Sequence, residues 1–239
     1  MTAIVNIDFT TSTFKWGGAS IGQVNLWCVH YLGFPLLGLA TALSARICRA
    51  TLRCRVVNGD ILLVRLKVHT LSGDDGVAVR RIDPNNNTAY NSLLKISPAA
   101  RGGILTKPLH QNFHMLYSAL GIDRVDLHAA LSHGGYTWAK FGFIPANPAE
   151  WSSLSARLTA KWTAERPHVS YELYRGIHRI LAHPSPMALR WLTDQRFIHT
   201  TKGISVGKFL LMGESWHGFL NLRDRQSVML FLHHAGAVP

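Results

Sequence analysis

One short segment in the middle of the chain carries side chains that can exchange protons. Asp126 and His128 alternate along residues 125–131 (VDLHAAL), a predicted strand, so both lie on one face of it. If that face lines a cleft, His128 can accept a proton from an amine, and His133 at the next turn is a second base candidate. The more common alternative for such a residue is a core histidine satisfied by hydrogen bonds.

A predicted hairpin presents a second chemistry, the binding of phosphates. Residues 49–57 and 61–69 flank Asn58-Gly59, a dipeptide that suits the positive φ angles of a tight turn. Apolar and basic residues alternate along both strands, and the basic face carries Arg49, Arg53, Arg55, Arg65 and Lys67. Such a face can contact phosphates, although no aromatic platform for single-stranded bases is interleaved with it. A solvated or helix-covered sheet face is the alternative.

The remaining candidate ligands for a metal ion do not form a site. His110 and His114 are four residues apart on a predicted helix, but no third ligand follows at a diagnostic spacing. A solvated helix face is therefore expected for this pair.

The three cysteines contain no CxxC motif and form no disulfide framework. Their low number fits a reducing compartment, so we expect a cytoplasmic protein, in the host cytoplasm if it is phage-encoded.

The charge balance narrows the class of partner. Among 239 residues, 25 are Lys or Arg and 13 are Asp or Glu, which gives a formal net charge of +12. This excess indicates an anionic partner: a nucleotide cofactor, a nucleic acid or an acidic protein surface. Solubility alone explains the same charge equally well. Because 47% of the residues are hydrophobic and only 16% are charged, the chain can form a sizeable core and long disordered segments are not expected.

The elements that must position these side chains predict a mixed α/β fold. Strands are expected at 3–9, 49–57, 61–69, 77–82, 88–97 and 125–131, and helices at 19–47 (broken near residues 33–35) and 104–120. After Pro145 the pattern becomes mostly helical, with helices at 149–164, 168–182, 186–194 and 224–235, the last capped by Asp224, and one strand at 204–212. We therefore expect a mostly antiparallel sheet flanked by helices, with a mostly helical C-terminal extension.

One apolar stretch is long enough to be tested as a membrane span. Residues 21–43 are largely apolar, but Gln23, Asn25 and His30 interrupt them and Pro35 would kink a helix there. A basic segment of the secretory type does not precede them. The sequence thus predicts buried core helices and no membrane association.

The order of elements over residues 88–143 resembles the core of GNAT-type N-acetyltransferases. A strand, a glycine-containing turn (PAARGGILTK), a helix, a second strand and a short helix ending in Gly142-Phe143 follow one another. In that family the turn presents backbone amides to a pyrophosphate at a helix N-terminus. By resemblance, the residues that bind the cofactor, acetyl-CoA or another acyl-CoA, are Ile96, Arg101, Gly102, Gly103, Ile104 and Trp138.

The resemblance implies transfer of an acyl group to an amine, with His128 as base and Tyr136 assisting the departing thiolate. Trp138 stands where many of these enzymes carry the tyrosine, and an indole N–H is not a usable acid. The resemblance gives a GNAT-like, acyl-CoA-binding core over residues 1–145 and an extension over 146–239. Two alternatives stay open: a non-catalytic GNAT-like module of a phage or effector system, and a protein that modifies or binds nucleic acid.

Overall fold

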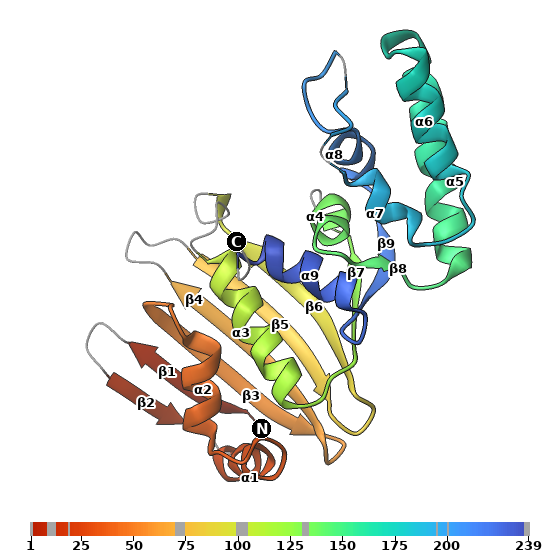
Figure 1. The fold of residues 1–239 in the computed structure, drawn as a ribbon. Coiled ribbons are helices and arrows are strands. Elements are labelled where there is room, and N and C mark those ends of the chain that lie inside the picture. Colours follow the sequence, from red (N-terminus) through yellow and green to blue (C-terminus); the bar gives the residue numbers. More distant parts are fainter. Residues whose placement is uncertain are drawn as a thin grey trace. The chain divides into compact units, whose positions relative to one another are not determined.

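The computed structural model describes residues 2–8, 13–18, 20–69, 75–98, 105–130, 134–194, 196–199 and 201–236 (Figure 1). As expected, the chain is a mixed α/β protein with a mostly antiparallel sheet flanked by helices and a mostly helical C-terminal part. It divides into two compact units, residues 1–125 with 232–239 and residues 126–231. The boundary expected after Pro145 lies within the second unit.

The first unit is built on a sheet whose neighbouring strands are all antiparallel, in the order β2-β1-β3-β4-β5-β6. Its strands are β1 (Ala3–Asp8), β2 (Thr13–Gly17), β3 (Arg49–Val57), β4 (Ile61–His69), β5 (Asp75–Asp83) and β6 (Thr88–Ile96). Its helices are α1 (Ile21–Leu32), α2 (Leu36–Ser44) and α3 (Thr106–Ala119). The sequence had predicted all of these except β2, with bounds that differ by a few residues.

The predicted hairpin is confirmed, and its turn explains the pairing of the two strands. Asn58 and Gly59 adopt φ angles of 51° and 84°, the left-handed values that a tight turn between twisted strands requires. The turn fixes the register, in which Val57 pairs with Ile61 and Arg49 pairs with His69 at the far end. Since side chains alternate between the faces of a strand, this register decides which residues of β3 and β4 share a face.

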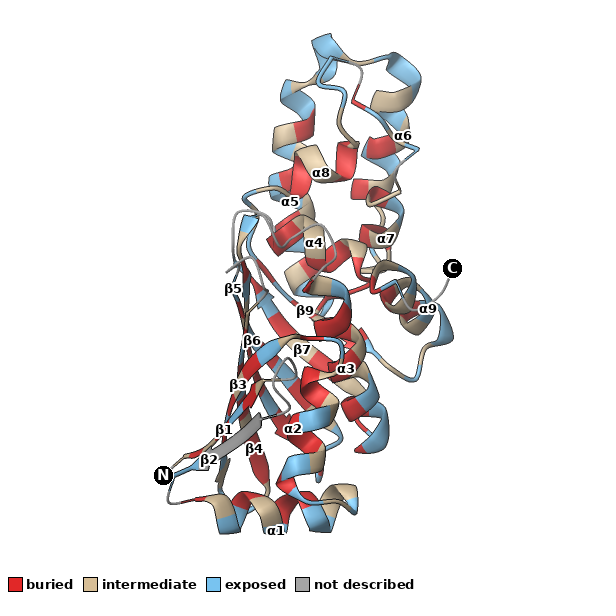
Figure 2. Ribbon diagram, turned by 90° about the vertical axis from the view of Figure 1, so that its left-hand side faces the viewer, coloured by how far each residue is buried: buried red, intermediate tan, exposed pale blue. Residues whose placement is uncertain are grey.

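Among the residues that the structure describes in the first unit, helices cover one face of the sheet and not the other. In Figure 1, α2 and α3 lie in front of the strands, and Figure 2 shows buried residues where helices and sheet meet. The apolar side chains of the hairpin point to this side, and Leu52, Val64 and Leu66 are no more than 1% exposed. Burial also raises the pKa of the Cys28 thiol to about 12, so it stays uncharged in this core.

The apolar stretch at residues 21–43 forms the two short helices that the sequence predicted. Val24, Trp27 and Leu39 are buried, while Leu26 is 71% exposed. No single helix in the described parts of the chain is long and apolar enough to cross a membrane. The helices α1 and α2 meet that criterion only as a pair, and they bend by 75° at the break between them.

The second unit contains most of the C-terminal helices. Its strands run in the order β7-β9-β8, and β7 and α9 each cross the division between the units. Its elements are β7 (Arg124–Ala129), α4 (Gly134–Lys140), β8 (Ile144–Pro145), α5 (Pro148–Ala164), the 3-10 helix η2 (Arg166–His168), α6 (Tyr171–Leu181), α7 (Ala188–Leu192), α8 (Val206–Leu211), β9 (Trp216–Asn221) and α9 (Arg225–His234). The predicted strand at 125–131 and the predicted cap of α9 by Asp224 are confirmed, since Asp224 accepts a hydrogen bond from the Ser227 N–H.

The predicted strand at 204–212 is wrong, because these residues form α8. The Ser205 side chain accepts a hydrogen bond from the Lys208 N–H and so caps a helix. Val206 and Leu210 are buried four residues apart, which is the spacing of one helix face. The strand of this region, β9, lies further along the chain and was not predicted.

Candidate functional site

The uncovered face of the first unit's sheet is strongly basic. Alternate residues of four neighbouring strands point to this side, and the cations among them are all exposed. We call this surface the basic sheet face: Arg49, Arg53, Arg55, Arg65, Lys67, Arg81 and Lys95. Five of these residues were predicted from the hairpin alone, and the strand pairing adds Arg81 and Lys95.

Two arginines on this face lie directly opposite each other. Arg53 of β3 pairs with Arg65 of β4, so their side chains leave neighbouring strands at the same level. Arg49 is balanced by Asp8, with Nε 3.1 Å from the carboxylate, and Lys67 by Asp75 at 3.4 Å. The other five cations of the basic sheet face form no ion pair with any residue that the structure describes.

The opposed arginines border a hollow in the surface of the sheet. It has a volume of about 470 Å³ and is lined by Ile4, Asn6, Thr51, Arg53, Arg65, Lys67 and His69. At its edge the Thr51 hydroxyl donates a hydrogen bond of 2.9 Å to the Asn6 side chain. Donors and cations therefore dominate its lining, which suits an anionic ligand with several oxygen atoms.

Two carboxylates lie at one end of this surface, Asp8 beside Arg49 and Asp75 beside Lys67. Partial burial acts to raise the pKa of Asp75, but its contacts with His69 and Lys67 hold that pKa below the usual range. Asp75 is therefore ionised at neutral pH, and it offsets the charge of Lys67. The excess positive charge consequently lies further along the strands, around Arg53 and Arg65.

Strand pairing also brings an aromatic ring to the basic sheet face. Tyr90 of β6 pairs with Arg81 of β5, Arg81 pairs with Leu63 of β4, and Leu63 pairs with Arg55 of β3. Tyr90 is 37% exposed. The sequence had shown no aromatic residue interleaved with these cations, because Tyr90 is far from the hairpin along the chain and only the sheet places them in one row.

His128 lies on the surface, so the alternative of a core histidine is wrong. It projects from β7 and is exposed. Its Nε2 shares a hydrogen bond of 2.8 Å with the Ser215 hydroxyl, and its ring stacks on His217 with centroids 4.2 Å apart. Both partners lie far away in the sequence, and nothing in the local pattern indicated them. His133 lies outside the described residues.

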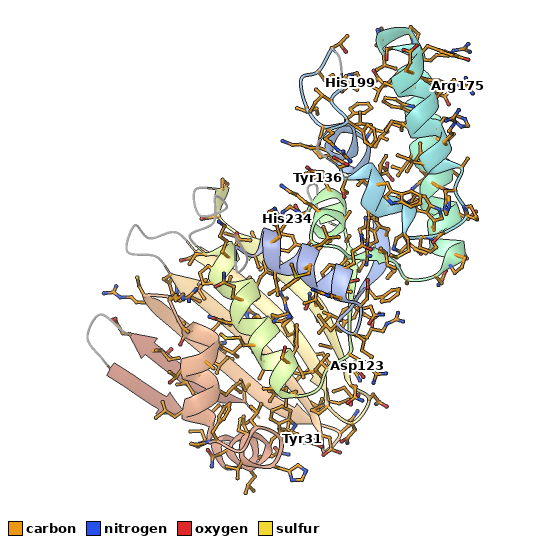
Figure 3. All side chains as sticks on the ribbon, viewed as in Figure 1. Tyr31, Asp123, Tyr136, Arg175, His199 and His234 are labelled. Atoms are coloured by element: carbon orange, nitrogen blue, oxygen red, sulfur yellow. The ribbon has the colours of Figure 1, made fainter. Side chains whose placement is uncertain are left out.

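The other residues expected to serve acyl transfer are only partly described. Tyr136 lies in α4 (Figure 3), where its hydroxyl accepts a hydrogen bond of 3.4 Å from Ser205. Trp138 on the same helix is 8% exposed and packs edge-on against Phe143. Ile96 is the buried last residue of β6 in the first unit. The turn with Arg101, Gly102, Gly103 and Ile104 lies outside the described residues.

The expectation that His110 and His114 form a solvated helix face is wrong for His110. It is only 3% exposed, and burial together with the nearby Arg80 charge lowers its pKa to about 3, so its imidazole is neutral. Burial also lowers the pKa of His114. The described residues contain no group of three or more His, Cys, Asp or Glu side chains that can hold a metal ion.

No family model, no curated protein and no solved structure matches this chain. A function can therefore be inferred only from the side chains described above.

Proposed function

We propose that this protein binds nucleic acid through the basic sheet face. One observation carries the proposal: Arg53 and Arg65 lie directly opposite each other, and no described acidic side chain pairs with either. Like charges in opposed positions destabilise an antiparallel strand pair. A phosphate backbone supplies the negative charge that this arrangement lacks, and arginine offers it two parallel N–H donors.

The arrangement of the cations supports a polymeric ligand over a small anion. Neighbouring strands are about 4.8 Å apart and alternate residues of one strand about 6.8 Å apart, so the side chains form a grid on a rigid support. Cations without a described ion-pair partner occur on β3, β4, β5 and β6. A single phosphate can reach one or two of them, whereas a chain of phosphates can reach several at once. The net charge of +12 would also attract such a polymer from a distance.

Binding to a fluorescent oligonucleotide, followed by anisotropy at several salt concentrations, tests the proposal. The variant is Arg53→Gln with Arg65→Gln, and the matched control is Arg179→Gln with Arg225→Gln, two exposed arginines of the second unit. Both variants lose two positive charges. Each phosphate contact contributes about 0.7 to 0.9 to the slope of log K against log salt, so the face variant should have a slope smaller by about 1.4 to 1.8.

The control variant should keep the slope of the unchanged protein. An equal loss of affinity in both variants would mean that net charge, and not the basic sheet face, binds the oligonucleotide. If the unchanged protein does not bind at low salt, the proposal is wrong.

We propose acyl-CoA-dependent acyl transfer to an amine as a second function, favoured by the exposure of His128. Its imidazole is open to solvent and within hydrogen-bond distance of the Ser215 hydroxyl, so it can pass a proton between an amine and water. Calorimetry with acetyl-CoA tests the cofactor, and Gly103→Asp should abolish the binding by repelling the pyrophosphate. The absence of binding by the unchanged protein would exclude this function.

A further inference from the structure

The basic sheet face changes in chemistry from one side to the other. On β3 and β4 the exposed residues near its centre are cations, Arg53, Arg55 and Arg65. On β6 they include Tyr90, which is 37% exposed, and Leu93, which is 36% exposed. The ligand therefore meets phosphate-binding groups on one side of the face and an apolar, aromatic surface on the other.

The ring of Tyr90 is available to a ligand. Its hydroxyl makes no hydrogen bond with any residue that the structure describes, and no described aromatic side chain packs on the ring. Tyrosine is common in strands for its shape alone, so its presence in β6 is not informative. Its position is informative, because Arg81 lies directly opposite and Leu63 separates Arg81 from Arg55 in the same row.

The face is too wide to enter the major groove of a double helix. From β3 to β6 the sheet spans three strand spacings, which is about 14 Å before side chains are counted. The major groove of B-DNA is about 12 Å wide and admits one helix or a two-stranded ribbon. In a duplex each base is also covered by its neighbours, so an aromatic ring on a flat surface cannot reach a base. In a single strand the base faces are free.

We infer that the nucleic acid bound by this face is single-stranded, with one base stacked on Tyr90 and the adjoining phosphates held by Arg81 and Arg55. This inference rests on the proposed function. It adds a class of ligand and a division of roles: the arginines bind the backbone without regard to sequence, and Tyr90 binds a base. Every base has an aromatic face, so stacking on one ring gives little sequence preference.

The test compares oligonucleotides that share a backbone and differ in their bases. The probes are a 15-nucleotide single strand of mixed sequence, the same length with abasic sites throughout, and the corresponding duplex. The variants are Tyr90→Ala and Tyr90→Phe, and Tyr171→Ala is the control because Tyr171 is a 62% exposed tyrosine of α6. Thermal unfolding of each variant checks that the fold is kept.

The unchanged protein should bind the single strand about tenfold more tightly than the abasic strand, as expected for one stacked base. Tyr90→Ala should remove that difference, while Tyr90→Phe and Tyr171→Ala should keep it. The inference is overturned if Tyr90→Ala binds the single strand as well as the unchanged protein does, or if the duplex binds as tightly as the single strand. Either result leaves the proposed function intact as long as the Arg53 and Arg65 variant loses affinity. Failure of the unchanged protein to bind any probe would overturn both.

Discussion

The opposed arginines make a prediction about stability that is independent of any ligand. If Arg53 and Arg65 repel each other, Arg65→Glu should replace a repulsion with an attraction and stabilise the first unit. Arg65→Gln is the matched control, because it removes the charge without reversing it. The difference between the two variants then isolates the attraction from the loss of the arginine side chain.

The expected magnitude follows from the register. Directly opposed Cβ atoms are about 5 Å apart, and flexible guanidinium groups can spread to about 7 Å, where two unit charges in water interact by about 0.6 kcal/mol. The Debye length is about 30 Å at 0.01 M salt and about 3 Å at 1 M, so screening leaves about 0.5 kcal/mol at the lower concentration and under 0.1 kcal/mol at the higher one. The full change from arginine to glutamate is twice that, about 1 kcal/mol at low salt.

Urea denaturation followed by circular dichroism gives the free energy of unfolding without adding salt, and amide hydrogen exchange in β4 locates the effect in the first unit. The gain of Arg65→Glu should be present at 0.01 M salt, nearly absent at 1 M, and lost at both when Arg53→Gln is added. A gain that does not depend on salt, or one that persists without the Arg53 charge, would show that repulsion between these arginines is not its source.

Two further predictions concern the second unit. A Cβ atom on Gly207 would lie 2.3 Å from the Leu192 carbonyl oxygen, whereas one on Gly176 would meet nothing within 4 Å. In chemical denaturation, Gly207→Ala should therefore lower the free energy of unfolding by about 1–3 kcal/mol, and Gly176→Ala should raise it by about 0.5–1 kcal/mol. The Lys202 ammonium holds the pKa of Glu165 below its ordinary value of 4.5, so the stability that this contact provides is present above pH 4.5 and lost as the pH falls through the lowered pKa. In Lys202→Met an NMR titration should find a higher pKa for Glu165. Lowering the pH should then reduce the free energy of unfolding of this variant by less than that of the unchanged protein.

Local patterns were sufficient for most elements of the first unit. The alternation of apolar and basic residues and the Asn58-Gly59 turn predicted β3 and β4, and the helical spacing predicted α3. These signals are local because a turn and an amphipathic face depend on residues that are close in the sequence. The same reasoning failed at residues 204–212, where a run of apolar residues suits a buried helix as well as a strand, and the Ser205 cap decides for the helix.

The candidate site depends on the tertiary structure even more than the fold does. The sequence by itself determined that the hairpin has one basic face, since alternation along a strand leaves no other outcome. Only the tertiary structure decided that Arg53 faces Arg65, that Arg81 and Tyr90 extend the row, and that His128 stacks on His217. Which residues of separate strands or loops meet depends on register and on the order of strands in a sheet. These are set by packing across the whole fold, because a shift by one residue would turn every buried side chain toward water.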